Sequence, residues 1–252
     1  MTSIHTNTWT RTQFHRFRGS VAFIETINSN GEIGIGTCFH VGEGVFVTAR
    51  HVIEGRSIAE IGFDDGYALL ALLEKPEHWG KKAHGSMNIL SGPHFHCDQT
   101  IDVACFKCEP YPKNWIPLGG HLNDWMGQYE LVLHPVLVLG YPPIPFSDRP
   151  VLVASAGEVN ALIDKYTGGH PHFVVSTMAR GGFSGGPALV AYNESDVENG
   201  TAALGLVTES LTKNDQAAEL GYTAILTVEP IYYCLKHHGL LPACQNFSPN
   251  LA

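Results

Sequence analysis

The sequence has no uninterrupted apolar run of about 18 residues, the minimum expected of a membrane-spanning helix. It is also short of charge: only 15% of its residues are charged, and 24 Asp and Glu outnumber 15 Lys and Arg, for a net charge of −9. This deficit of positive charge argues against nucleic acid or an anionic membrane as the main partner. The 44% of hydrophobic residues in 252 is nevertheless a globular composition, sufficient for one large or two small domains.

A secretory signal is missing from the first 20 residues, which have neither an apolar core nor a small-residue cleavage site. They contain Arg and Thr but no acid before Glu25, as organelle transit peptides do, and that alternative stays open. We expect residues 1–19 to form a flexible tail and the protein to be cytoplasmic. Its six cysteines are then expected to be reduced thiols.

One stretch, "HFHCDQTIDVACFKC", concentrates possible metal ligands, namely His94, His96, Cys97, Cys105 and Cys108. Its second part, "IDVACFK", is typical of a strand, in which residues three apart point to opposite faces. Cys105 and Cys108 could not then ligate one zinc ion. The sequence therefore predicts no metal site.

Long helical patterns are nearly absent before the end of the chain, whereas short β-like runs separated by turn residues recur throughout. The expected strands are 20–27, 33–41, 44–49, 67–74, 101–108, 136–141, 150–159, 172–178, 187–192, 202–210 and 221–228. Strands without alternating helices favour barrels or sandwiches over a βαβ fold. In "EPIYYCLKHHG", Pro230 is placed as the first helical residue and Gly239 as the stop signal of a helix.

The predicted fold is all-β: two six-stranded antiparallel β-barrels with the active site between them and a C-terminal helix. The expected divisions are the tail, an N-terminal barrel, a C-terminal barrel, and a helix with a tail, at 1–19, 20–125, 126–228 and 229–252. The linker is expected in the stretch "GGHLNDWMGQYE", and no internal repeat is found.

Three motifs contain residue types that perform nucleophilic catalysis together. "GVFVTARHVIEG" places His51 directly after an apolar strand, and "DVACFK" places Asp102 at the start of another. "RGGFSGGPAL" surrounds Ser184 with four glycines. Singly, His51 is typical of a loop residue and Asp102 of a strand-edge acid, and 14 histidines make a chance match easy. All three motifs together, in the order His, Asp, Ser, predict a site for nucleophilic catalysis.

The chemistry explains why these residue types belong together. A serine hydroxyl is a weak nucleophile at neutral pH and needs a base within hydrogen-bonding distance. A neutral imidazole suits that task, and a carboxylate fixes its tautomer and stabilises the imidazolium. Gly182 lies two residues before Ser184, so both N–H groups could converge on one oxygen as an oxyanion hole. Loss of one such donor costs about two to three orders of magnitude in rate.

"GGFSG" also fits the G-x-S-x-G turn of α/β-hydrolases, which joins a strand to a helix. In those enzymes both the acid and the histidine follow the serine. Here "GGPALVAY" after Ser184 is typical of a strand, and the alternating helices of that fold are missing. The α/β-hydrolase interpretation is therefore rejected.

"TARHV", "DVACFK" and "GFSGGP", in this order, resemble the trypsin/chymotrypsin-like serine peptidases, a double-barrel superfamily, over residues 20–238. The resemblance implies His51 as general base, Asp102 as its orienting carboxylate and Ser184 as nucleophile. The amides of Gly182 and Ser184 would form the oxyanion hole.

The same resemblance assigns residues around the substrate. It implies that Thr208, in "GLVTES", supports Asp102, and that residues 206–210 line an edge where an extended substrate pairs by β-augmentation. It places Met178 at the floor of the primary pocket. The other pocket residues that it implies are Ala179, Arg180, Gly181, Val207, Glu209 and Ser210. An apolar floor without a buried acid predicts a medium-sized apolar residue at the cleavage position.

Two departures separate the sequence from secreted, zymogen-type members. Phe183 stands where those enzymes have an aspartate that pairs with a new N-terminus, and Val52 stands where they have a bridged cysteine. The chain resembles the non-zymogen, reduced-compartment branch, and we expect it to have no PDZ-like extension. Since cleavage cannot activate it in that way, we expect restraint by a strict substrate requirement, a regulatory partner, or an effector that orders the glycine-rich loop.

The sequence thus predicts a cytoplasmic serine endopeptidase that acts on polypeptides through an acyl-enzyme and uses no cofactor. Nucleic acid and membranes are not expected as partners. Two alternatives stay open: a catalytically silent trypsin-like module that binds polypeptides, and an esterase that uses the same three residues.

Overall fold

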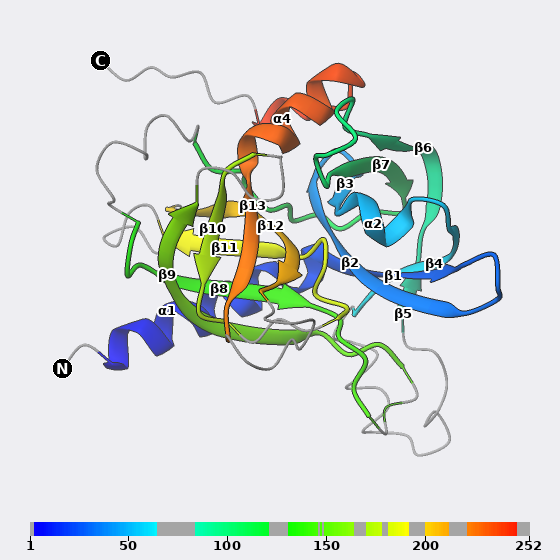
Figure 1. The fold of residues 1–252 in the computed structure, drawn as a ribbon. Coiled ribbons are helices and arrows are strands. Elements are labelled where there is room, and N and C mark those ends of the chain that lie inside the picture. The colour runs from blue at the N-terminus through cyan, green and yellow to red at the C-terminus, as the bar shows by residue number, and fades with distance from the viewer. Residues whose placement is uncertain are drawn as a thin grey trace.

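The computed structural model describes residues 3–64, 84–120, 131–145, 147, 149–163, 170–177, 181–191, 200–211 and 221–245. Two antiparallel sheets account for most of this part of the chain, and they lie side by side (Figure 1). The strand expected at 67–74 and the expected boundary between residues 125 and 126 lie outside the described residues.

The first sheet has the strand order β5-β4-β1-β2-β3-β7-β6. Its strands are β1 (Val21–Ile27), β2 (Ile33–Gly42), β3 (Val45–Thr48), β4 (Ser57–Asp64), β5 (His84–Ser86), β6 (Asn88–Phe95) and β7 (Ala104–Glu109). The two edge strands, β5 and β6, are separated by Met87 alone. The two edge strands are therefore the two halves of one bent segment. If that segment is counted once, the sheet has six strands, as the sequence predicts.

The second sheet is a closed six-stranded barrel with the order β10-β13-β12-β11-β8-β9. Its strands are β8 (Pro135–Gly140), β9 (Val153–Ile163), β10 (His172–Val175), β11 (Pro187–Ala191), β12 (Thr201–Ser210) and β13 (Thr223–Thr227). Among the described residues, closure pairs every strand of this sheet on both sides, although β12 extends beyond the end of its pairing with β11.

The larger apolar core joins the first barrel to one face of the second and to the C-terminal helix, and a smaller core belongs to the second barrel alone. In the first, the rings of Phe46 and Phe106 stack with centroids 5.9 Å apart. In the second, Phe173 and Phe183 are buried among aliphatic side chains. The predicted all-β, two-barrel architecture is confirmed.

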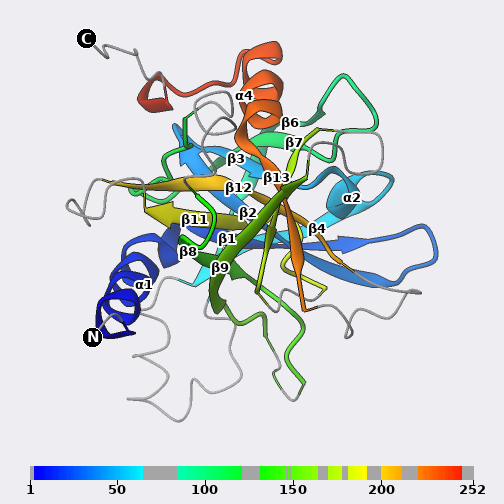
Figure 2. The ribbon, with the colours of Figure 1, turned by 60° about the vertical axis from the view of Figure 1, so that its left-hand side comes forward.

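The N-terminal segment differs from the expected flexible tail. Helix α1 (Ser3–Phe17) is followed by a short 3-10 turn (Arg18–Ser20) and packs beside β8 (Figure 2). Trp9, Gln13 and Phe17, spaced four residues apart, are all buried, because this spacing places them on one face of the helix. The Trp9 indole N–H donates to the Thr201 hydroxyl at 3.2 Å, which joins the helix to β12.

The C-terminal helix α4 (Val228–His237) lies where the sequence predicts it and contacts β7, β12 and β13, so it touches both barrels (Figure 1). Pro230 is its third residue rather than its first, still within the turn whose N–H groups have no helical acceptor. Gly239, with φ +64°, follows the C-cap as expected. No helix in the described part of the chain is both long and apolar enough to cross a bilayer.

Candidate active site

His51 projects from the first barrel because the residues around it are buried. All four residues of β3 are buried, and Ala49 ends the extended segment before the single-turn helix α2 (Arg50–Ile53). Val52 and Ile53 turn into the core, which leaves the His51 side chain 51% exposed. The imidazole is thus held on a rigid element and remains accessible.

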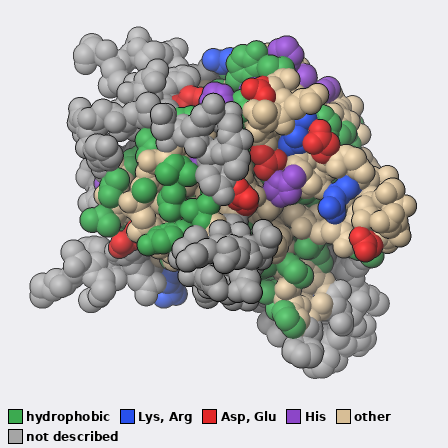
Figure 3. Space-filling view, viewed as in Figure 1, with side chains coloured by type: hydrophobic (Ala, Val, Ile, Leu, Met, Phe, Trp, Pro, Cys, Tyr) green, Lys and Arg blue, Asp and Glu red, His purple; other side chains and the backbone are tan. Residues whose placement is uncertain are grey.

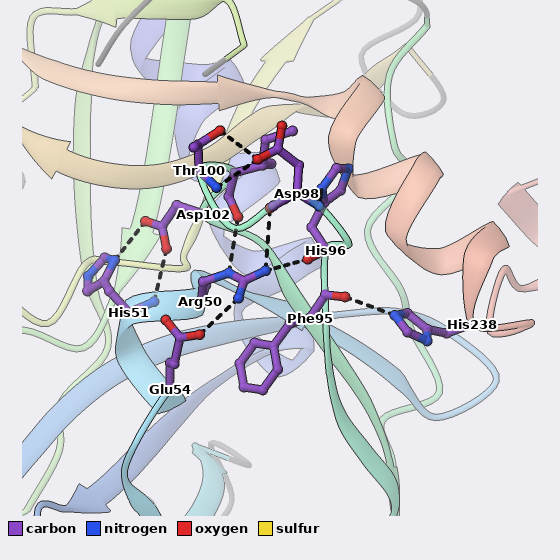
Figure 4. A network of polar contacts seen from close by, with 10 residues as sticks. Arg50, His51, Glu54, Phe95, His96, Asp98, Thr100, Asp102 and His238 are labelled. Carbon is purple, nitrogen blue, oxygen red and sulfur yellow. Dashed lines mark hydrogen bonds and ion pairs between the residues drawn. The ribbon is translucent and has the colours of Figure 1, made fainter. Parts of the chain in front are cut away.

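Asp102 faces His51 from the loop between β6 and β7. Its neighbours Ile101 and Val103 are buried, so the carboxylate is directed outwards and its side chain is 27% exposed. One oxygen, Oδ1, accepts the backbone N–H of His51 at 2.9 Å, while Oδ2 lies 2.7 Å from His51 Nδ1 (Figure 4). This double contact favours the tautomer with the proton on Nδ1 and leaves Nε2 as the acceptor.

Ser184 lies in a tight turn before β11. Gly182 and Gly185 on either side have φ +96° and +81°, a left-handed conformation that favours glycine. Phe183 anchors the turn because its side chain is 2% exposed and belongs to the core of the second barrel. Among the described residues, neither the Gly182 nor the Ser184 N–H donates to a protein acceptor.

The turn packs directly against the segment that leads to His51. A Cβ atom at Gly185 would clash with Thr48 Oγ1 and would lie 2.8 Å from the Ala49 nitrogen. Because Ala49 is two residues before His51, Ser184 and His51 are carried by segments in contact. The structure therefore brings all three sequence-predicted residues to the junction between the barrels.

Thr37, on β2 of the first barrel, is a residue that sequence analysis missed. Its N–H donates to the Ser184 carbonyl at 2.9 Å, and its hydroxyl donates to the Gly182 carbonyl at 2.6 Å. The same hydroxyl accepts the Tyr141 N–H at 2.9 Å. Since Thr37 is fully buried, these bonds fix the turn of the second barrel on the first without competition from water.

Comparisons with known proteins agree with this geometry. The family model for the trypsin-like peptidase domain matches residues 36–194. The chain belongs to the trypsin-like peptidase family.

As a member of that family, the protein is a hydrolase of the serine protease type. The Rv3671c protease from M. tuberculosis is similar in fold: its active form has a TM-score of 0.59 at 17% identity, covering 94% of this chain and 86% of the other. Its inactive form has a TM-score of 0.57 at 16% identity, covering 95% and 96%. The HtrA-type protease AlgW with a tripeptide has a TM-score of 0.59 at 15% identity, and the match covers 92% of this chain and 63% of the AlgW chain. No sequence match to a curated protein was found.

Thr208 of the peptidase is near the site but differs from expectation. Its hydroxyl donates to the Ala224 carbonyl at 3.3 Å, so its single proton is not directed to Asp102. Its carbonyl instead accepts the Ser184 hydroxyl at 3.4 Å. Thr208 therefore contacts the serine rather than the aspartate.

The predicted substrate pocket is described only in part. Met178, Ala179 and Arg180 lie outside the described residues, and so does the side chain of Ser210. Gly181 and Glu209 are exposed, while Val207 is buried. The pairing of β11 with β12 ends at Leu206, whereas β13 pairs with β12 as far as Ser210. In the described structure, residues 208–210 of β12 thus have a strand neighbour on one side.

Acidic and histidine side chains lie near the junction of the barrels, with Asp102 in contact with His51. Figure 3 shows acidic and histidine side chains close together near the middle of this face. His172 on β10 is buried, and burial lowers its pKa, while the carboxylates of Glu209 and Asp102 act in the opposite direction. The carboxylates of Glu209 and Asp102 therefore act electrostatically on the same buried histidine.

The thiols among the possible metal ligands found in the sequence, Cys105 and Cys108, have different surroundings in the structure. Within the described residues, no group of three or more His, Cys, Asp or Glu side chains is arranged to hold a metal ion. Cys105 lies 3.7 Å from Cys234 of α4, sulfur to sulfur. Cys108 is buried elsewhere in the core, and burial raises the pKa of its thiol to about 12. Burial therefore disfavours the thiolate form of Cys108.

Proposed function

We propose that the protein is a serine endopeptidase that works through an acyl-enzyme. Ser184 is the nucleophile, His51 the general base and Asp102 the carboxylate that stabilises the imidazolium. The observation that carries this proposal is the double contact of Asp102 with the backbone N–H and the Nδ1 of His51. It leaves Nε2 of His51 free to accept the serine proton.

The first half of the reaction follows from this arrangement. The 3.4 Å bond between the Ser184 hydroxyl and the Thr208 carbonyl is long, so rotation of the side chain frees the hydroxyl at little cost. As Oγ bonds to the peptide carbonyl carbon, its proton moves to His51 Nε2. The carbonyl oxygen becomes an oxyanion, which the N–H groups of Gly182 and Ser184 stabilise; one such donor contributes about 3–4 kcal/mol.

The second half regenerates the enzyme. The C–N bond of the peptide breaks, and His51 gives its proton to the leaving amine. Water then attacks the carbonyl carbon of the ester on Ser184 while His51 takes its proton. The bond from that carbon to Oγ breaks, His51 returns the proton to Oγ, and the new carboxyl end is released. Asp102 stays ionised throughout and balances the positive imidazolium.

The substrate is proposed to be an extended polypeptide with a medium-sized apolar residue at the cleavage position. The part of β12 that extends past β11 supports this, since unpaired strand backbone can bind a peptide as an added strand. The free state of all six cysteines agrees with a reducing compartment such as the cytoplasm. Restraint by a partner, an effector or strict substrate choice is part of the proposal, because Phe183 removes control through a new N-terminus.

Unstructured casein and a set of fluorogenic peptides test this function. We expect peptide-bond cleavage after apolar residues and an acyl group on Ser184 when the reaction is quenched in acid, with no adduct in Ser184→Ala. Hydrolysis of small esters but of no peptide would indicate an esterase. Binding of casein without cleavage or adduct, with or without cell extract as a source of effector, would indicate the binding module and contradict the proposal.

A further inference from the structure

Arg50, the residue before His51, is a buried cation directed into the loop that carries Asp102. Its side chain is only 8% exposed, although it lies on the same single helical turn as the exposed His51. Its guanidinium carbon is 5.0 Å from the centroid of the Phe95 ring. A buried charge is costly unless hydrogen bonds satisfy it, so its partners indicate what it holds.

The guanidinium donates to three backbone carbonyls of one loop (Figure 4). Nε donates to the Ile101 carbonyl at 3.3 Å, and Nη2 donates to the carbonyls of His96 and, at 3.4 Å, Asp98. On the solvent side, Nη1 donates to Glu54 Oε1 at 2.9 Å, one helical turn further along the chain. Glu54 is 53% exposed, so this ion pair is screened by water.

The loop that Arg50 fills is closed on itself. The His96 N–H donates to the Val103 carbonyl at 3.1 Å, and the Ile101 N–H donates to the Asp98 carbonyl at 3.2 Å. Asp98 Oδ1 also accepts the N–H and the hydroxyl of Thr100, at 2.9 and 2.8 Å. Asp102 lies at the end of this loop, and the carbonyl that Nε contacts belongs to the peptide bond between Ile101 and Asp102.

We propose that Arg50 is a positioning residue that sets the distance between the acid and the base of the site. Its backbone is covalently joined to His51, and its side chain holds the peptide unit that leads into Asp102. One residue thereby fixes both partners of the 2.7 Å contact between His51 Nδ1 and Asp102 Oδ2. The inference rests on the proposed function, because the contact matters for rate only if His51 acts as the base.

The role requires arginine rather than any cation. The three carbonyls accept hydrogen bonds from two nitrogens of one guanidinium, Nε and Nη2. A rigid fork of five donors suits such a set of acceptors. A lysine ammonium is a single point with flexible geometry, so it can satisfy some of these carbonyls but cannot fix their spacing. A methionine fills similar space but donates no hydrogen bond to any of these carbonyls.

The test compares the wild type with Arg50→Lys, Arg50→Met and a matched control, Arg56→Met, which changes an exposed arginine six residues further on. One readout is the low-field proton NMR resonance of the Nδ1–H between His51 and Asp102, assigned by its loss in His51→Ala. The other is kcat and KM on a peptide substrate. Circular dichroism and thermal unfolding report whether each variant folds.

We expect Arg50→Met to lose the low-field resonance and about 100-fold in kcat, the effect of a displaced catalytic group, with KM nearly unchanged. Arg50→Lys should fall between, at about 10-fold, and Arg56→Met should match the wild type. A role in stability alone would change the melting temperature and leave the resonance and kcat unaltered.

A folded Arg50→Met with the wild-type resonance and kcat overturns the inference. If Arg50→Met does not fold, Arg50→Lys decides by the same two readouts: a weakened resonance with lowered kcat supports the role, and wild-type values overturn it. If neither folds, Arg50 serves the fold and not the site, which also overturns it. A wild type without peptidase activity refutes the proposed function, while the resonance still decides the placing of Asp102 by Arg50.

Discussion

Replacement of Thr37 by valine tests how the first barrel holds the nucleophile of the second. Valine has the shape of threonine but lacks the hydroxyl that donates to the Gly182 carbonyl at 2.6 Å and accepts the Tyr141 N–H at 2.9 Å. Both bonds are buried, and each group that loses its partner costs about 1–3 kcal/mol. The free energy of unfolding should therefore fall by about 2–6 kcal/mol, and the melting temperature by about 5–20 °C.

The same change should reduce catalysis, because it loosens the turn that presents the Gly182 and Ser184 N–H groups. A displaced oxyanion donor predicts about a 100-fold lower kcat with little change in KM. Calorimetry and peptide turnover measure the two effects. Thr37→Ser is the matched control, since it retains the hydroxyl and loses one methyl group, at a cost of about 1 kcal/mol. If Thr37→Val melts and turns over substrate like Thr37→Ser, the hydroxyl does not hold the turn.

Three further predictions concern the acid, the anchor and pH. Asp102→Asn should lower kcat about 10⁴-fold while the protein stays folded, because the amide favours the wrong tautomer of His51; peptide turnover checks this. Phe183→Ala should lower the free energy of unfolding in urea by about 3–5 kcal/mol, since its ring is buried in the second barrel. Burial lowers the pKa of His40 from 6.5, so the unfolded chain binds its proton more readily. The contribution of neutral His40 to the free energy of unfolding is then fully present above pH 6.5 and is lost as the pH falls below it. Denaturation in urea from pH 7.5 to 5 should show this decline.

Each of these predictions has a contradicting result. An Asp102→Asn variant with more than a tenth of wild-type kcat would show that the carboxylate does not orient the base. A Phe183→Ala variant as stable as the wild type would mean that the ring does not anchor the turn. For pH, His40→Gln should flatten the dependence, since it removes one buried neutral imidazole, and an unchanged slope would assign the effect to other groups.

The residues of the reactive constellation could be found from the sequence because each stands in a recognisable local context. His51 follows an apolar strand, Asp102 precedes one, and Ser184 lies among glycines. That they meet in space could be expected only from the resemblance, because the motifs occur in the same order, His, Asp, Ser, as in the peptidases that the sequence resembles. Helix α1 also had a local signal, the four-residue spacing of Trp9, Gln13 and Phe17, which the polar residues between them obscured.

Other features have no local signal. Thr37 contacts Gly182 across 145 residues of chain, and Arg50 contacts the His96 carbonyl across 46. Nothing near either residue in the sequence indicates its partner, because the partner is set by how the barrels pack. Strand β6 was not predicted for a different reason. It contains Gly92 and Pro93, which are turn signals, and most of its residues face solvent.

Labelling with a fluorophosphonate probe tests the central claim most directly, because the probe bonds to a serine only where a base activates it and an oxyanion site receives the phosphoryl oxygen. Peptide mapping of the labelled wild type should place the adduct on Ser184, and neither Ser184→Ala nor His51→Ala should be labelled. An adduct at another residue, or equal labelling of the His51→Ala variant, would contradict the assignment of these two residues as nucleophile and base.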